Sequence, residues 1–182
     1  IGGDKINVTA IVKGTQDPHF IEAKPSYLVA LSRADLLIAV GLSLEQGWLP
    51  LLQRGARQPK VLPGGSGFLD ASEGVNPIEV AKDADRSEGD VHPFGNPHYM
   101  ADPTRAMTVA EHIKKKLIEL DHENEKAFEA GFATFKRELT AHIQDWKKRL
   151  APFKGIKIIG YHKTFNYLFD LLSFEIVGYL EP

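Results

Sequence analysis

The chain has no cysteine among its 182 residues. This absence excludes disulfide bonds, thiolate metal ligands and a cysteine nucleophile within these residues. An excess of one charge is also absent, because 22 Lys and Arg face 24 Asp and Glu, which gives a net charge of −2. Such a nearly equal number of positive and negative side chains gives no excess of positive charge to attract a nucleic acid, and we expect no nucleic-acid partner. The longest apolar run, Leu36 to Val40 with its flanks, is far shorter than the roughly 18 to 20 residues of a membrane span.

What is present is an ordinary globular composition, with 43% hydrophobic and 25% charged residues. Short β-branched runs alternate with helical segments in the first part of the chain. This pattern predicts strands over 5–12, 35–40 and 60–62 and helices over 25–33 and 44–54. Such alternation favours a parallel α/β sheet. Residues 66–103 are rich in Gly, Pro, Asp and Ser and are predicted to be mostly loop.

Two helices are predicted next, the first from Pro103 and the second from about Glu123 to Leu150. Apolar residues recur at every third or fourth position of the second helix, which is the period of one helix face. A helix of this length is a rod of roughly 42 Å, long enough to connect two lobes. The remaining segments, 156–160, 163–172 and 174–179, read as strand, helix and strand, a βαβ unit.

The seven histidines fall into two groups. His112, His122 and His142 lie in predicted helices beside charged residues and are interpreted as solvated surface. His19 and His98 share a different pattern, in which Asp or Asn precedes Pro and then His. An Asx-turn and the fixed proline φ predict a stiff loop at both places, and stiffness suits a metal ligand. Two unrelated turns that happen to carry histidine remain the alternative.

His162 follows a predicted strand, and the carboxyl ends of parallel strands are where α/β sheets bind ligands. A solvent-facing residue at a helix start is the alternative for His162. His92 is the weakest candidate, as an auxiliary ligand. Three imidazoles without cysteine suit zinc, whereas manganese prefers more oxygen ligands. A tetrahedral site needs a fourth donor, usually a carboxylate, and no acidic residue in the sequence is compelling.

These segments resemble the solute-binding proteins of bacterial zinc and manganese ABC transporters, a family that includes metal-binding adhesin-like lipoproteins. Three histidine loops carry the resemblance, together with the strand and helix after the first loop. The matching segments are Gln16-Asp17-Pro18-His19 with Glu22 and Pro25-Ser26; Ala34 to Gly41 with Leu44-Glu45 and Trp48-Leu49; Asn96-Pro97-His98 closing at Asp102-Pro103; and Tyr161-His162-Lys163 with Tyr167 and Glu175 to Tyr179.

The resemblance implies an α/β fold of two parallel-sheet lobes bridged by one long helix, with the C-terminal lobe largely missing from this chain. The expected parts are an N-terminal metal-binding lobe over 1–122, the inter-lobe helix over 123–154 and the start of the C-terminal lobe over 155–182. The resemblance also implies that His19, His98 and His162 ligate the metal. The family's first strand and helix would precede Ile1, and its acidic fourth ligand would lie beyond Pro182.

The function implied is not enzymatic. The protein would capture a divalent metal ion, zinc with manganese as the alternative, and deliver it to a membrane ABC transporter permease. It would work as a monomer in the periplasm or at the cell surface. One alternative is a zinc-dependent hydrolase with a three-histidine site. Such an enzyme needs a general base beside the metal. Glu22 is the only acid near a ligand loop, and its simplest role is instead to orient a ring N–H. A manganese-specific binding protein or adhesin is another.

Overall fold

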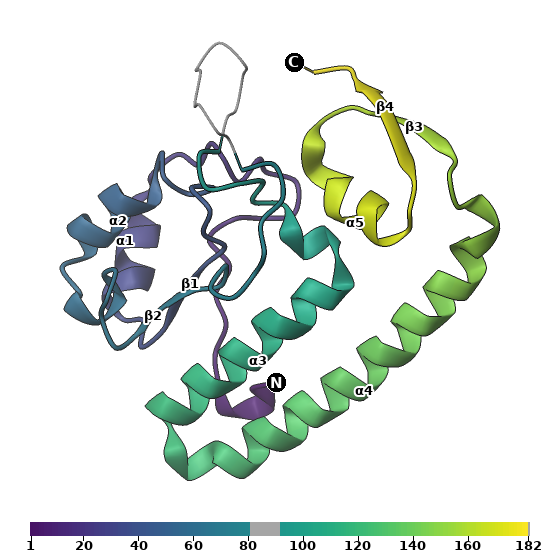
Figure 1. Cartoon of the computed structure of the whole chain (residues 1–182). Helices are drawn as coiled ribbons and strands as arrows, with labels where there is room; N and C mark the ends of the chain where they lie inside the picture. Colours follow the sequence, from purple (N-terminus) through teal and green to yellow (C-terminus); the bar gives the residue numbers. More distant parts are fainter. Residues whose placement is uncertain (81–91, 182) are drawn as a thin grey trace.

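The computed structural model describes residues 1–80 and 92–181. Figure 1 shows a small α/β unit beside the first of two long antiparallel helices, and a second small α/β unit at the C-terminal end of the other. The first unit contains helix α1 (Pro25–Ser32), strand β1 (Leu37–Ala39), helix α2 (Leu49–Ala56) and strand β2 (Phe68–Asp70). The long helices are α3 (Pro103–Leu120) and α4 (Glu125–Leu150), and the last unit contains β3 (Lys157–Gly160), α5 (Asn166–Leu171) and β4 (Glu175–Tyr179). This arrangement fits the predicted α/β class.

The first sheet is a parallel pair, in which Leu37 of β1 lies opposite Phe68 of β2. Its core contains buried side chains of α1, α2, β1 and the 3₁₀ helix Pro59–Val61, among which Leu31, Leu52 and Val61 are at most 2% exposed. Gly67 is required where the chain enters β2, because a Cβ there would lie 2.1 Å from the backbone oxygen of Asp35. The absence of a side chain therefore lets β2 approach the segment before β1.

Two of the predicted strands are wrong. Residues 5–12 do not form a strand; a 3₁₀ helix, Gly3–Lys5, is followed by irregular chain in which Val8 is 81% exposed. Residues 60–62 are largely a 3₁₀ helix, Pro59–Val61, and the second strand lies at Phe68–Asp70, inside the predicted loop. β-branched residues favour a strand only when a neighbouring strand is there to pair with, and Val61 reaches the core from a turn instead.

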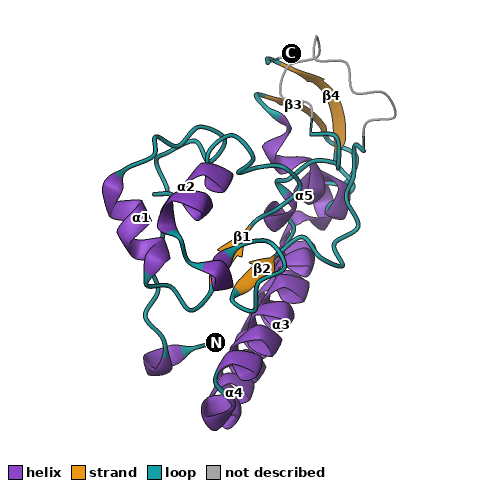
Figure 2. Ribbon diagram, turned by 90° about the vertical axis from the view of Figure 1, so that its left-hand side faces the viewer, coloured by secondary structure: helices purple, strands orange, loops and turns teal. Residues whose placement is uncertain are grey.

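Helices α3 and α4 pack against each other side by side, as Figures 1 and 2 both show. Asp102 caps α3 by accepting hydrogen bonds from the backbone N–H and the hydroxyl of Thr104. In α4 the predicted apolar face is buried mainly in the N-terminal half, where Phe128 is fully buried. Towards the C-terminal end Trp146 remains 40% exposed. None of the helices in the described ranges is both long and apolar enough to cross a membrane.

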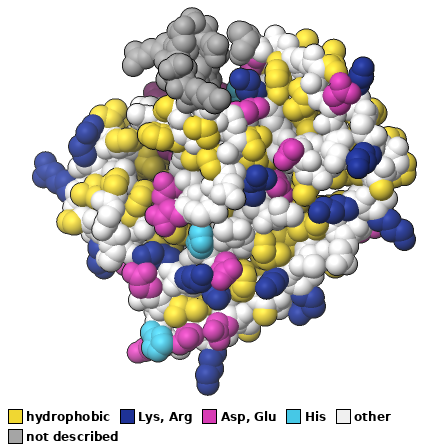
Figure 3. Space-filling view, viewed as in Figure 1, with side chains coloured by type: hydrophobic (Ala, Val, Ile, Leu, Met, Phe, Trp, Pro, Cys, Tyr) yellow, Lys and Arg dark blue, Asp and Glu magenta, His cyan; other side chains and the backbone are white. Residues whose placement is uncertain are grey.

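The last unit is the predicted βαβ, with β3 and β4 parallel and Lys157 opposite Glu175. The helix between them is shorter than predicted, because the 3₁₀ turn Lys163–Phe165 precedes α5. The sheet has only these two strands among the described residues, and Ile159 and Val177 are more than half exposed. On the face shown in Figure 3, acidic and basic side chains are interspersed.

Candidate metal centre

Three loops from different parts of the fold bring His19, His98 and His162 together. His19 lies before α1, His98 directly precedes the 3₁₀ helix Tyr99–Ala101, and His162 follows β3. One ring nitrogen of each lies within 4.8 Å of the others. The Nε2 atoms of His98 and His162 are 3.2 Å apart, and their rings are nearly perpendicular at 85°. The three residues predicted from the sequence therefore form one cluster of potential metal donors.

The two Asx-turns that the sequence predicts hold the first two imidazoles. The backbone N–H of His19 donates to Oδ1 of Asp17 at 2.9 Å, and that of His98 donates to Oδ1 of Asn96 at 2.9 Å. In each turn the intervening proline fixes φ. The rings are therefore placed by the local sequence before any ion binds.

Carboxylates fix the ring orientation of two histidines. Nδ1 of His19 lies 2.7 Å from Oδ1 of Asp17, and Nδ1 of His162 lies 2.9 Å from Oε2 of Glu181. Because a carboxylate accepts hydrogen bonds, each Nδ1 carries the proton and each Nε2 keeps its lone pair for a metal. The sequence interpretation of Glu22 was wrong, since Glu22 is exposed and Asp17 and Glu181 orient the rings. The sequence predicts the turn at Asp17, and the structure adds that the same oxygen also holds the ring of His19.

Buried polar side chains connect these loops. The indole Nε1 of Trp48 donates to the carbonyl of Pro18 at 2.9 Å. The amide nitrogen of Asn96, a residue only 5% exposed, donates to the carbonyl of Lys163 at 2.9 Å. The hydroxyl of Tyr167, which is fully buried, donates to the carbonyl of Asn96 at 2.6 Å. The loops of His98 and His162 are thus tied together next to their histidines.

The electrostatics of the cluster favour neutral imidazole at His98. Burial lowers the pKa of His98, and the neighbouring rings of His19 and His162 lower it further, to about 4. At Asp17 burial by itself raises the pKa, but hydrogen bonds from the backbone and ring of His19 lower it overall. A neutral imidazole beside an ionised carboxylate is the state that binds a cation.

The remaining histidines lie in different surroundings. Nε2 of His92 is 3.2 Å from Nε2 of His19, so His92 touches the cluster. His122 is 82% exposed, and His142 is exposed and stacks on Trp146, as expected of surface residues. The prediction is wrong for His112, whose Nδ1 is buried and has no hydrogen-bond partner among the described residues. The charged neighbours of His112 in the helix suggested a solvated side chain, but in the structure His112 faces the turn at Gly74.

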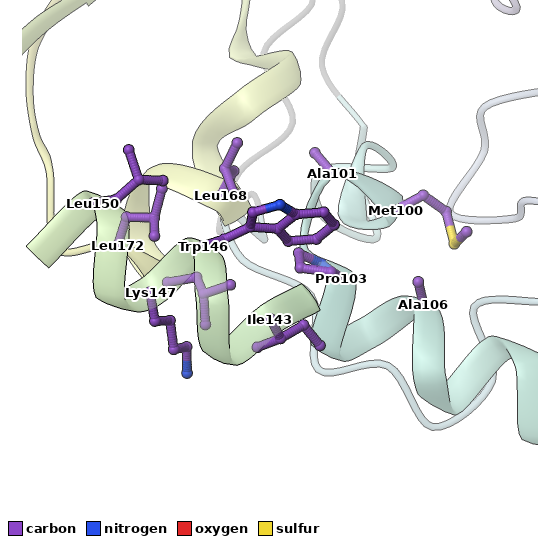
Figure 4. A pocket seen from close by; sticks show the side chains of 11 residues that line it. Met100, Ala101, Pro103, Ala106, Ile143, Trp146, Lys147, Leu150, Leu168 and Leu172 are labelled. Atoms are coloured by element: carbon purple, nitrogen blue, oxygen red, sulfur yellow. The ribbon is translucent and has the colours of Figure 1, made fainter. Parts of the chain in front are cut away.

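A cavity of about 380 Å³ lies apart from the histidines, between the start of α3, the end of α4 and α5. Figure 4 shows the indole of Trp146 reaching from α4 towards Pro103. The lining is almost entirely apolar, with Lys147 as its charged member. Because no carboxylate or imidazole lines it, this cavity has no donors for a metal ion.

Comparison with known proteins gives a consistent match. The sequence model of a family described as "ZnuA: Zinc-uptake complex component A periplasmic" matches residues 1–182. A manganese ABC transporter substrate-binding lipoprotein of Streptococcus gordonii is 30% identical over 82% of this chain and 46% of its own length. The zinc-binding lipoprotein AdcA of Streptococcus pneumoniae is 26% identical over 92% of this chain and 33% of its own length.

Solved structures agree with the sequence matches. A zinc-bound ZnuA deletion mutant superposes with a TM-score of 0.82 at 30% identity, covering 98% of this chain and 63% of its own. A cadmium-bound periplasmic metal-binding protein of Candidatus Liberibacter asiaticus superposes with a TM-score of 0.78 at 26% identity, covering 100% of this chain and 62% of its own. The chain therefore spans about half the length of the Streptococcus gordonii relative, about a third of AdcA and less than two thirds of these structures.

Proposed function

Because the chain belongs to the ZnuA family of periplasmic metal-uptake components, we propose that it binds a divalent metal ion for delivery to a membrane ABC transporter permease. The family consists of solute-binding proteins rather than enzymes. The family is described as periplasmic and the relatives are named as lipoproteins, so the family lies outside the cytoplasm, as the sequence predicted. The permease as partner and the monomeric state are part of the proposal.

One observation carries the proposal: the ring nitrogens of His19, His98 and His162 converge within 4.8 Å. Donors around one zinc ion at about 2.0 to 2.1 Å would lie about 3.3 Å apart in a tetrahedron. The 3.2 Å between Nε2 of His98 and of His162 already matches this edge. We assign the three histidines as ligands, with Asp17 and Glu181 holding two of the rings.

We propose zinc as the preferred ion. Imidazole nitrogen is a borderline-soft donor that suits zinc, whereas manganese sites use more carboxylate and water oxygen. Among the described residues, the carboxylates of Asp17 and Glu181 face Nδ1 atoms of the cluster, so they orient rings in the present arrangement. The relatives include manganese and zinc proteins by name, so the donor set is what favours zinc.

The proposed domain organisation follows the same assignment. Residues 1–122 form the metal-binding lobe, α4 within 123–154 is the connecting helix, and 155–182 begin a second lobe. In this arrangement His19 and His98 come from one side of the site and His162 from the other. An ion bound by all three would hold the two sides together.

The test is a titration of metal-free protein with zinc and with manganese, followed by a competing chelator dye. We expect one tightly bound zinc per chain and weaker manganese. The variants His19→Ala, His98→Ala and His162→Ala should each lose the site, while His122→Ala, changed at an exposed histidine, should keep it. Retention of the unaltered affinity by all three ligand variants would refute the assignment.

A further inference from the structure

The carboxylate of Glu79 connects two of the loops that carry the histidines. Its Oε2 accepts a hydrogen bond from the side-chain amide of Asn96 at 2.9 Å, and its Oε1 accepts one from the side-chain amide of Asn166. Asn96 lies two residues before His98, whereas Asn166 lies four residues after His162 and begins α5. One carboxylate therefore joins the loop of His98 to the segment that follows His162.

Glu79 determines how the side-chain amide of Asn96 is oriented. Both protons of Nδ2 are used, one by Glu79 and one by the carbonyl of Lys163 at 2.9 Å, while Oδ1 accepts from the backbone N–H of His98 at 2.9 Å. If the amide turned over, its oxygen would face the carboxylate and the carbonyl, and the Asx-turn at His98 would lose its acceptor. Asn96 is only 5% exposed, so an unpaired amide there is costly.

The same carboxylate holds Asn166 on the other side. Asn166 is 2% exposed, and its Nδ2 donates to Glu79 and, at 2.6 Å, to the hydroxyl of Tyr179 in β4. Its Oδ1 has no hydrogen-bond partner among the described residues, so the contacts of Nδ2 are what fix this side chain. Removal of the carboxylate would leave a buried amide proton without an acceptor.

The backbone at Glu79 is held in an unusual conformation. Its φ is 56°, in the left-handed region that residues with a side chain rarely adopt. The preceding residue, Ile78, accepts from the backbone N–H of Asn96 at 2.9 Å and donates its own N–H to the hydroxyl of Tyr167 at 3.2 Å. Such strain persists where surrounding contacts enforce it, and it is common at functional sites. Here it directs an exposed residue towards two buried amides.

We propose that Glu79 is a positioning residue of the metal site, which sets the spacing of His98 and His162 through Asn96 and Asn166. The inference rests on the proposed function and adds no ligand to it. Nε2 of His98 and Nε2 of His162 lie 3.2 Å apart without an ion. A pair of donors that is already in place saves the cost of ordering two loops when the ion binds. Glu79 should therefore strengthen zinc binding.

The test uses Glu79→Gln, which keeps the length of the side chain but offers one acceptor oxygen where two amides donate. Zinc affinity is measured by competitive titration, the geometry of the donors by the visible absorption spectrum of bound cobalt(II), and the stability of metal-free protein by urea unfolding. We expect zinc affinity to fall about tenfold, the lower end of the range for residues that directly orient a metal ligand, because Glu79 acts through the two asparagines. The cobalt spectrum should change as well.

Glu73→Gln is the matched control, because it removes an exposed carboxylate six positions away in the same connecting segment. Its zinc affinity and cobalt spectrum should equal those of the unaltered protein. Glu79→Gly is a second variant that removes the carboxylate while glycine adopts the positive φ without strain. It should fold and show a similar loss of zinc affinity.

The outcomes separate this inference from the proposed function. If the unaltered protein binds zinc and both Glu79 variants keep its affinity and cobalt spectrum, Glu79 does not position the site and the proposed function stands. A lower urea midpoint with unaltered affinity and spectrum would show that Glu79 serves stability alone, which also overturns the inference. An equal loss in Glu73→Gln would assign the effect to net charge and overturn it too. If the unaltered protein binds no zinc, the proposed function fails and the inference fails with it.

Discussion

The carboxylate of Asp17 offers the sharpest single perturbation of the site, because one oxygen performs two tasks. Oδ1 accepts from the backbone N–H of His19 at 2.9 Å and from its ring Nδ1 at 2.7 Å. Asp17→Ala removes the turn and the ring partner together. Asp17→Asn keeps an oxygen of the same geometry for both contacts but removes the negative charge.

The two variants should therefore differ in degree. Loss of a carboxylate that orients a metal-binding imidazole lowers metal affinity by about 10- to 100-fold. We expect Asp17→Ala to reach this range, because the ring also loses the turn that restricts it. Asp17→Asn should fall between Asp17→Ala and the unaltered protein, since the amide oxygen still selects the Nδ1–H tautomer. The side chain of Asp17 is 57% exposed, so neither change should prevent folding.

The assay is competitive zinc titration, with circular dichroism to verify the fold. Glu22→Gln is the matched control: Glu22 is an exposed carboxylate only three positions from His19. It removes the same charge without touching the ring, and its affinity should match that of the unaltered protein. Equal losses in Glu22→Gln and Asp17→Asn would mean that only the general negative potential matters. That result would refute the orienting role of Asp17.

Three further predictions concern pH and packing. The pKa of His98 is lowered to about 4 in the folded protein, whereas in the unfolded chain His98 binds a proton near the ordinary imidazole pKa of about 6.5. The melting temperature of metal-free protein should therefore fall as pH drops from about 6.5 towards 4. A melting temperature that does not change over this range would contradict the burial argument. Tyr167→Phe should cost about 1–3 kcal/mol in urea unfolding, because the Asn96 carbonyl and Ile78 N–H lose their partner; a neutral effect would show that water replaces the hydroxyl. Phe128→Ala, at a fully buried position of α4, should lower the free energy of unfolding by about 3–5 kcal/mol. Phe153→Ala, at a 51% exposed position, should lower it much less.

The sequence was most informative where local chemistry decides the structure. The two Asx-turns depend on residues two positions apart, so the neighbours of His19 and His98 were sufficient to predict them. Helix α4 was predicted within about two residues of its observed bounds, because its periodic apolar positions extend over many turns. The βαβ unit at the end was likewise predicted from the pattern of apolar residues along the chain.

The errors come from interactions between distant segments. The segment 5–12 has strand-forming residues but pairs with no strand in the described part of the chain. Strand β2 lies where glycine permits a close approach to Asp35. His112 was predicted to be solvated from its charged neighbours, whereas packing of α3 against the first unit buries its Nδ1. No pattern within a helix reveals which part of the chain will cover it.

The sequence by itself determined that His19 and His98 stand in rigid loops and that His162 follows a strand. Only the tertiary structure decided that these residues, from three distant segments, bring their ring nitrogens within 4.8 Å of one another. It likewise selected Asp17 and Glu181 as the ring partners, in place of Glu22, and brought His92 to His19. The physical reason is that turns are short-range hydrogen-bond patterns, whereas a metal site is a point in space that only the packing of the whole chain defines.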